Sequence, residues 1–145
     1  YRPKAIKTLL IGECPPVNGQ YFYIPKANYR EIALASTIFM HYFNKTTRSI
    51  DEYCKFLLRL RSLGVFVIDI MDTPMKIRGN KENEKVLVKE IPKLRDKIKF
   101  RGIDVNDEDV VFLLARKSYK KEIRKHFPDS KLVSWKKFRT SAVIR

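Results

Sequence analysis

The sequence predicts a single three-layer α/β/α domain with a short, mostly parallel four-stranded sheet. Two observations support this class. First, four short runs rich in apolar and β-branched residues alternate with segments whose apolar residues recur at helical spacing. Second, a chain of 145 residues that is 44% hydrophobic can bury one substantial core and hardly two. We therefore expect one domain over residues 1–145.

The four apolar runs are expected to form the strands. A continuous apolar run that ends at a breaker is typical of a strand covered on both faces, and the first two runs end near Gly12 and Pro74. The predicted strands are Lys7–Ile11, Val65–Ile70, Asp109–Ala115 and Lys131–Ser134.

Capping residues place the first two helices. Asn28 and Glu31 have the spacing of a capping box, so the first helix should begin at Asn28. Ser49 and Glu52 repeat this spacing and predict a second helix, which should stop at Gly64.

The remaining helices follow from apolar spacing alone. The charged segment Lys76–Glu84 is expected to be a mobile loop, and Pro92 implies either a kink or a later helix start near Ile91. The other predicted helices are Val86–Ile98, Ser118–Phe127 and Lys136–Ile144.

This order of elements favours a parallel sheet with right-handed crossovers and helices on both faces. The carboxyl ends of parallel strands share one edge, so the residues that follow the strands should meet around one crevice, bordered by the triplet Tyr21–Phe22–Tyr23. Those residues are Glu13 and Cys14, Asp69 and Asp72, Arg116 to Ser118, and Ser134 to Lys137.

The charge of the chain indicates a polyanionic partner. The net charge is +15 with a pI near 9.9, more than solubility requires. Residues 116–145 contribute 11 Lys and Arg against Glu122 and Asp129, which is typical of a nucleic-acid footprint. The alternative is a lysine-rich surface of a hot-growing organism, but that composition normally raises glutamate as well.

Several classes of protein are disfavoured. The two cysteines and the two isolated histidines have neither disulfide nor zinc nor iron–sulfur spacing. No apolar run approaches the roughly 20 residues of a membrane span, and no signal peptide is visible. We expect a monomer without cofactor, metal or membrane partner, in the cytoplasm (nucleoid-associated) or the nucleus, and not secreted.

The first strand and the residues after it resemble the uracil-DNA glycosylase superfamily. Gly12–Glu13–Cys14–Pro15–Pro16 is similar to the family's first motif, a strand that ends in glycine, a polar pair and proline. The family next places an aromatic side chain that stacks on the extruded base, where this chain has Tyr21–Phe22–Tyr23. Asp69 ends the second strand, where the family reads the base edge, and the third strand and its following helix also fit.

The resemblance implies hydrolysis of the bond between a base and its sugar. A carboxylate would stabilise the oxocarbenium-like sugar and orient water, and a donor would stabilise the departing base, with no need for a metal. The implied catalytic residues are Glu13, Cys14 and Ser134; the base-binding residues are Phe22, Tyr23 and Asp69; and the DNA-binding residues are Lys117, Lys120, Lys121, Arg124, Trp135, Lys136 and Lys137.

Three positions depart from the family's pattern. Cys14 stands where other branches place aspartate or asparagine, and the last motif, Lys131 to Lys137, lacks the family's histidine. Asp69 replaces an asparagine, and an ionised carboxylate can only accept hydrogen bonds. Asp69 is therefore protonated, or the base carries an amino group, or another residue reads the base.

Purely structural roles compete with these assignments. Phe22 can pack in the core and leave stacking to Tyr21 or Tyr23, Trp135 can cap the sheet instead of wedging into DNA, and Asp72 can organise a turn. We expect DNA binding with excision of a deaminated or damaged base, uracil first. The alternatives are an inactive glycosylase-like nucleic-acid-binding protein and a doubly wound nucleotide-binding domain.

Overall fold

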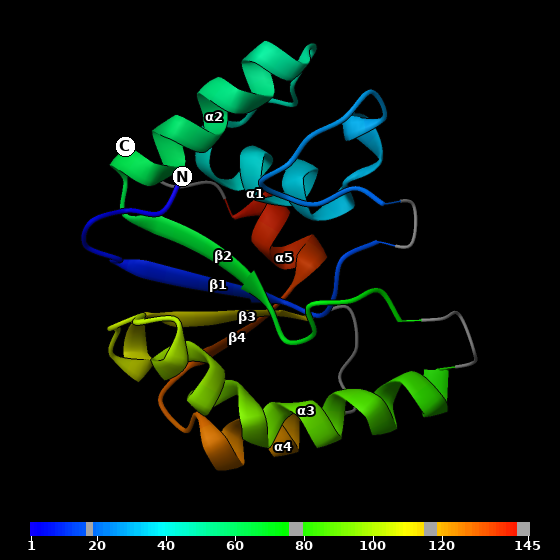
Figure 1. Cartoon of the computed structure of the whole chain (residues 1–145), viewed down its shortest axis with the longest axis vertical. Helices are drawn as coiled ribbons and strands as arrows, with labels where there is room; N and C mark the ends of the chain where they lie inside the picture. The colour runs from blue at the N-terminus through cyan, green and yellow to red at the C-terminus, as the bar shows by residue number, and fades with distance from the viewer. Residues whose placement is uncertain (17–18, 76–79, 115–118, 142–145) are drawn as a thin grey trace.

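Four strands form one parallel sheet at the centre of the molecule (Figure 1). The computed structural model describes residues 1–16, 19–75, 80–114 and 119–141. Within them the strand order is β2-β1-β3-β4, and all three pairings are parallel. The predicted α/β class is confirmed. The strands are β1 (Thr8–Gly12), β2 (Val65–Asp69), β3 (Val110–Leu114) and β4 (Lys131–Ser134).

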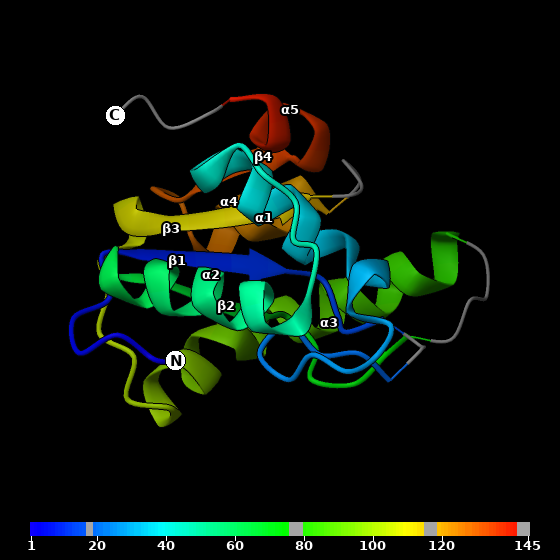
Figure 2. The same cartoon turned by 90° about the horizontal axis from the view of Figure 1, so that it is seen from above.

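Helices cover both faces of the sheet. On the face that we call the first, above the sheet in Figure 1, lie α1 (Ala33–Phe43), α2 (Ile50–Ser62) and α5 (Trp135–Thr140). On the second face lie α3 (Asn80–Phe100) and α4 (Lys120–His126). Figure 2, seen from above, shows the strands side by side beneath the first layer.

Strand β1 is central, and its apolar residues are divided between two cores. Leu10 packs against the first layer, and Leu9 and Ile11 pack against the second, with 0–1% of each side chain exposed. A strand that is buried on both faces has no position for a polar side chain, which explains its continuous apolar run.

The sheet contains a topological switch point between β1 and β3. The helix that follows β1, α1, lies on the first face, and the helix that follows β3, α4, lies on the second face (Figure 1). The carboxyl edge between two such adjacent strands is where open α/β sheets bind ligands. Glu13 and Cys14 come directly after β1 and lie at this point.

The predicted start of the first helix at Asn28 is wrong. A short 3-10 helix, Tyr29–Glu31, comes first and α1 begins at Ala33. The Asn28 side chain accepts a hydrogen bond from Gln20 Nε2 and donates to Glu31 Oε2 (3.2 Å), so it is engaged in the preceding loop and not in a helix cap.

The predicted bounds of the second helix are confirmed. Ser49 Oγ accepts a hydrogen bond from the Glu52 backbone N–H at 3.1 Å, as an N-cap requires. The helix ends at Ser62, and Gly64 has a φ of 76°, a left-handed conformation that glycine adopts without strain.

Helix α3 is longer than predicted and passes through Pro92. The expected loop is wrong for residues 80–84, which are helical, while residues 76–79 lie outside the described part. An interior proline removes one hydrogen bond and costs roughly 3 kcal/mol. The apolar stripe outweighs this cost, since each buried Leu or Ile contributes roughly 1.5–3 kcal/mol. Its members are Leu87, Ile91, Leu94 and Ile98.

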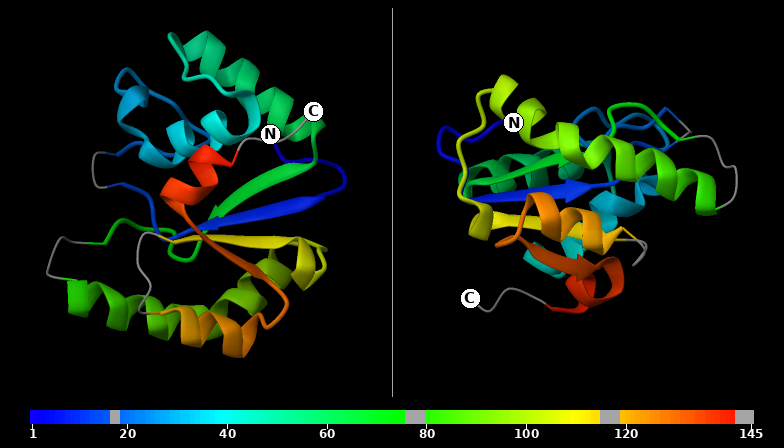
Figure 3. Two further views of the ribbon diagram at one scale, coloured as in Figure 1. Left: turned by 180° about the vertical axis from the view of Figure 1, so that it is seen from behind. Right: turned by 90° about the horizontal axis from the view of Figure 1, so that it is seen from below.

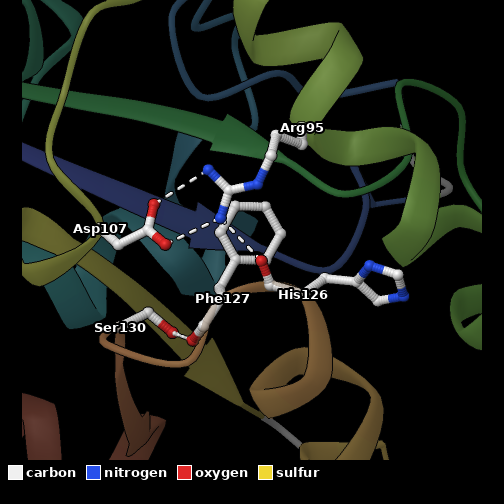
Figure 4. Close-up of polar contacts among 5 residues, drawn as sticks. All are labelled: Arg95, Asp107, His126, Phe127 and Ser130. Atoms are coloured by element: carbon white, nitrogen blue, oxygen red, sulfur yellow. Dashed lines mark hydrogen bonds and ion pairs between the residues drawn. The ribbon is translucent and has the colours of Figure 1, made fainter.

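Arg95 of α3 joins three segments of the second layer (Figure 4). Its guanidinium donates to both carboxylate oxygens of Asp107, at 3.0 and 2.8 Å, and to the His126 carbonyl oxygen at the end of α4, at 2.7 Å. The guanidinium carbon lies 4.4 Å from the centre of the Phe127 ring. Ser130 Oγ donates to the Phe127 carbonyl oxygen at 2.8 Å and closes the turn before β4.

We predict that Arg95→Lys lowers the free energy of unfolding by about 1–2 kcal/mol, because lysine cannot form the planar two-pronged pair with Asp107 and also reach His126. Urea unfolding measures the change. Lys93→Ala is the control on the same helix: the Lys93 side chain is 72% exposed, with its Nζ 3.5 Å from Glu90 Oε1, and its loss should change stability by less than about 0.5 kcal/mol. Equal effects of the two substitutions would contradict the role of Arg95.

Candidate functional site

Glu13 and Asp69 lie at the carboxyl ends of neighbouring strands. Asp69 is paired in register with Gly12, and Glu13 follows directly. The backbone pairing continues past the strands, because Ile70 N–H donates to the Gly12 carbonyl oxygen and Met71 N–H donates to that of Glu13, both at 2.9 Å. The Glu13 side chain is buried, with 8% exposed. The two carboxyl groups are thus held on a fixed backbone.

Gly12 makes room for the carboxylate of Asp69. A Cβ atom on Gly12 would lie 2.7 Å from Asp69 Oδ1 and 3.1 Å from the Leu34 side chain of α1. A side chain at residue 12 would therefore displace the Asp69 carboxylate. Asp69 therefore lies over the end of β1, between the sheet and the start of α1.

Burial raises the pKa of Asp69 to about 6. The positive charges of Lys97 and Arg101 oppose this rise, and the negative charges of Asp72 and Glu13 add to it. Asp69 Oδ1 is buried and accepts no hydrogen bond from any residue that the structure describes. A carboxyl group with this pKa carries a proton in an appreciable fraction of molecules near neutral pH, and in that form it both donates and accepts.

Lys97 anchors the end of β2 from the second face. Its Nζ donates to the carbonyl oxygens of Asp69 (2.8 Å) and Ile70 (3.3 Å) and pairs with Asp72 Oδ1 at 2.7 Å. Arg101 pairs with the same oxygen at 2.8 Å. Burial opposes ionisation of Asp72, but Lys97 and Arg101 outweigh it and lower the pKa of Asp72.

The joint role of Lys97 and Arg101 was not predicted from the sequence. Lys97 is in the last turn of α3, and Arg101 directly follows the helix and donates its N–H to the Lys97 carbonyl oxygen at 3.1 Å; this four-residue spacing is the available signal for their joint role. Their target, Asp72, belongs to a different element, and nothing in the local sequence identifies it.

Phe22 lies in the first core, with 9% of its side chain exposed. Its ring makes edge or tilted contacts with Tyr23, Phe39 and Tyr53, and its carbonyl oxygen accepts a hydrogen bond from the Tyr53 hydroxyl at 2.7 Å. In this conformation the ring packs in the core and is closed to a base, which matches the structural alternative for Phe22.

Tyr23 closes the outer edge of the sheet. Its hydroxyl oxygen accepts a hydrogen bond from the Val67 N–H of edge strand β2 at 2.8 Å, and its ring stacks on Tyr1 and Phe66 at 5.9 and 5.4 Å. Burial raises the pKa of Tyr23 well above its usual value. Tyr21, with 41% exposed, is the member of the triplet that faces solvent.

Residues of the last motif, Lys131 to Lys137, also have structural roles. Ser134 Oγ accepts a hydrogen bond from Lys137 N–H at 3.2 Å and caps α5. Trp135 Nε1 donates to the Leu113 carbonyl oxygen at 3.1 Å, and its ring packs against the first core. Trp135 is therefore held on the sheet, as the alternative for this residue expects.

The basic residues occupy both faces near β4. Lys120, Lys121 and Arg124 lie on α4 and Lys136 and Lys137 on α5, while Lys117 is outside the described residues. Both helices begin at the carboxyl edge of the sheet, so their first turns lie on the same edge as Glu13 (Figure 1). Cys14, half-buried and a thiol, lies on this edge too.

No three His, Cys, Asp or Glu side chains among the described residues are grouped so that they could hold a metal ion. In the same part of the chain, no helix combines the length and the apolar character needed to cross a membrane.

We predict that Asp69→Asn stabilises the protein increasingly as the pH rises. The pKa of Asp69 is higher in the folded than in the unfolded state, so its contribution to folding stability is full below pH 4 and is lost as the pH rises through about 6. Asparagine does not ionise and therefore avoids this loss. At pH 7 to 8 the free energy of unfolding of the variant, measured with urea, should exceed that of the wild type by up to about 3 kcal/mol.

The control is Asp72→Asn, for which the sign is reversed. The pKa of Asp72 is lowered, so its carboxylate contributes stability above pH 4 that is lost on acidification. The variant should be less stable than the wild type at pH 7 and equal to it at low pH. A pH-independent effect of Asp69→Asn would show that Asp69 titrates normally.

Comparison with known proteins adds no relative: no protein-family model matches the chain, and no curated protein and no solved structure matches it significantly.

Proposed function

We propose that this protein binds DNA and excises a deaminated or damaged base, uracil first, by hydrolysing its N-glycosidic bond, as a divergent relative of the uracil-DNA glycosylases. The observation that carries the proposal is the pair of carboxyl groups at the switch point of the sheet: Glu13 is buried, and Asp69 is half-buried with a buried Oδ1 and a pKa raised to about 6. Two neighbouring carboxyl groups in different environments are a usual means of dividing acid and base roles.

Protonated Asp69 resolves the main departure from the family's pattern. Uracil presents a donor at N3 and an acceptor at O4 on one edge. A neutral carboxyl group accepts from the first and donates to the second, as the family's asparagine amide does. The raised pKa thus supports the alternative in which Asp69 carries a proton.

In this proposal Glu13 stabilises the positive charge on the sugar and accepts a proton from the attacking water. The bond between C1′ and the base nitrogen breaks with its electron pair on the base, and the sugar becomes oxocarbenium-like. A nearby carboxylate stabilises that charge most effectively where solvent is excluded, and Glu13 is 8% exposed. Water adds to C1′, and the proton that it loses passes to Glu13 and then to the base, which leaves an abasic sugar.

Tyr21 takes the stacking role in this proposal. Phe22 is buried and Tyr23 holds the sheet edge, whereas Tyr21 is exposed in a tight turn closed by a hydrogen bond from Ile24 N–H to its carbonyl oxygen at 3.0 Å. The buried Gln20 braces the turn by accepting a hydrogen bond from Lys26 N–H. The net charge of +15 supports binding to the phosphates of DNA.

A second candidate is DNA binding without catalysis. It is favoured by the packing of Phe22 and Trp135 and by the capping role of Ser134, which leave these three residues in structural use. Release of free uracil from a uracil-containing duplex separates the two candidates. A nucleotide-binding domain would instead bind mononucleotides as tightly as long DNA.

We predict that Glu13→Gln lowers uracil excision by a factor of about 10² to 10⁴, the range for a positioned acid–base group. DNA affinity and the urea unfolding midpoint should be retained, because the amide has the same size. Single-turnover base release is the measurement, so that slow product dissociation cannot conceal the chemical step. Undiminished excision by a folded Glu13→Gln variant would remove Glu13 from the mechanism.

We also predict that Asp69→Asn keeps uracil excision and abolishes its dependence on pH between 6 and 8. In the wild type the pKa of Asp69 is about 6, so at pH values well above 6 the fraction of molecules with protonated Asp69 falls about tenfold per pH unit. The single-turnover rate of uracil release should fall in parallel. Asparagine stays neutral, so the variant's profile should be flat. Asp129→Asn, which removes an exposed carboxylate, should leave the wild-type profile unchanged. A wild-type rate that is constant over this range contradicts the assignment to Asp69.

A further inference from the structure

A further pocket lies on the first face, and neither Glu13 nor Asp69 is among its lining residues. A pocket of about 480 Å³ is formed where α5 meets the amino end of α1, two elements that lie against each other in Figure 3. This volume is in the range of small-molecule sites. The lining residues are Arg30, Glu31, Ala33, Ser36, Thr37, Trp135, Lys136 and Arg139.

The pocket is strongly cationic. Arg30 comes from the turn before α1, and Lys136 and Arg139 come from α5, while Glu31 is the one carboxylate among the lining residues. Arg30 is oriented by hydrogen bonds from Nη2 to the Arg48 carbonyl oxygen (3.1 Å) and from Nε to the Tyr29 hydroxyl (3.2 Å). Three cations around one cavity are suited to an anion with several oxygen atoms.

Helix α1 adds its positive end to the same cavity. Ala33 is both the first residue of this 11-residue helix and part of the pocket lining. The residue before it, Ile32, has no polar side chain with which to cap the first N–H groups. The partial positive charge of the helix terminus therefore reinforces the three cationic side chains.

The walls of the pocket are held together by a specific contact. His41 of α1 and Phe138 of α5 stack at 3.8 Å with 16° between their rings, and His41 Nδ1 bonds to the Phe138 carbonyl oxygen at 2.8 Å. Burial lowers the pKa of His41, which favours a neutral ring that donates this bond. The relative position of the two helices, and with it the spacing of the cations, is therefore fixed.

Trp135 contributes the apolar part of the site. Its Nε1–H is used toward the sheet, in the bond to the Leu113 carbonyl oxygen, so the indole offers the pocket its carbon surface. An aromatic surface beside cations is the combination that binds a nucleotide, whose sugar or base is apolar and whose phosphate is anionic.

We propose that the pocket between α1 and α5 binds a phosphorylated nucleotide unit, with the phosphate between Arg30, Lys136 and Arg139 and the sugar or base against Trp135. Such a unit comes either from a nucleic-acid chain or from a free nucleotide. The site does not require excision by Glu13 and therefore stands independently of the catalytic proposal.

The test uses the intrinsic fluorescence of Trp135, the single tryptophan in the sequence. Inorganic phosphate, dTMP and a short single-stranded oligothymidylate are titrated into the wild type, into Lys136→Gln/Arg139→Gln and into Lys85→Gln/Lys89→Gln. The last variant removes the same charge from exposed residues of α3 on the opposite face and is the matched control. Urea unfolding verifies that each variant is folded.

We expect dTMP or the oligonucleotide to change the fluorescence of the wild type and of the control at similar concentrations. The pocket variant should need at least about 10-fold more ligand, because it loses two charged contacts to the phosphate. Tighter binding of the oligonucleotide than of dTMP assigns the unit to a nucleic-acid chain, and equal binding assigns it to a free nucleotide.

Two results overturn the proposal. One is a pocket variant that titrates like the wild type, and the other is a wild type whose fluorescence responds to none of the three probes. If Lys136→Gln/Arg139→Gln fails to fold, Arg30→Gln tests the opposite wall and should weaken binding in the same direction. The Glu13→Gln variant separates this proposal from the catalytic one. It should show the wild-type fluorescence response to the nucleotide probes whether or not the wild type excises bases.

Discussion

Burial of β1 on both faces is the constraint on which the rest of the structure depends. Leu9, Leu10 and Ile11 are almost completely covered, and this requires a neighbouring strand on each side and a helical layer above and below. A strand in that position cannot carry chemistry along its length. Its first polar side chain, Glu13, therefore lies just beyond its end, at the middle of the sheet's carboxyl edge, where the connections to the two helical layers separate.

The charges of the molecule are arranged in opposite ways inside and outside. Lys and Arg outnumber Asp and Glu by 31 to 16 in the sequence, whereas the carboxyl edge of the sheet holds the buried Glu13 and the half-buried Asp69 at the ends of neighbouring strands. Burial and mutual repulsion favour the protonated form of one carboxyl group, and Lys97 and Arg101 limit this effect. The proposed function would use both charges in one chain: the basic excess would attract a polyanion over the surface, and the carboxyl groups would act on a developing positive charge at contact distance.

The features that could be predicted from the sequence are those that arise from residues close together in the chain. The strands, the Ser49 cap and the stop at Gly64 all follow from local patterns and were confirmed. The start of α1 was not predicted, because Gln20 from an earlier loop engages Asn28. For the same reason the contacts of Arg95 with Asp107 and of Lys97 with Asp72 were missed, since each joins two separate elements. The order of residues in the triplet Tyr21–Phe22–Tyr23 also does not show which ring is buried. In the structure Phe22 is buried and Tyr21 is exposed.

The pairing of β1 also determines when the sheet can assemble. Thr8 pairs with Val65 and Leu9 with Val110, so each neighbour of the central strand is synthesised long after the strand itself. Closing such long loops precedes any gain from the core, which makes parallel sheets of this kind slow to fold. Until then the apolar run of β1 lacks both of its partner strands, and the net charge of +15 disfavours association of unfinished chains by repulsion.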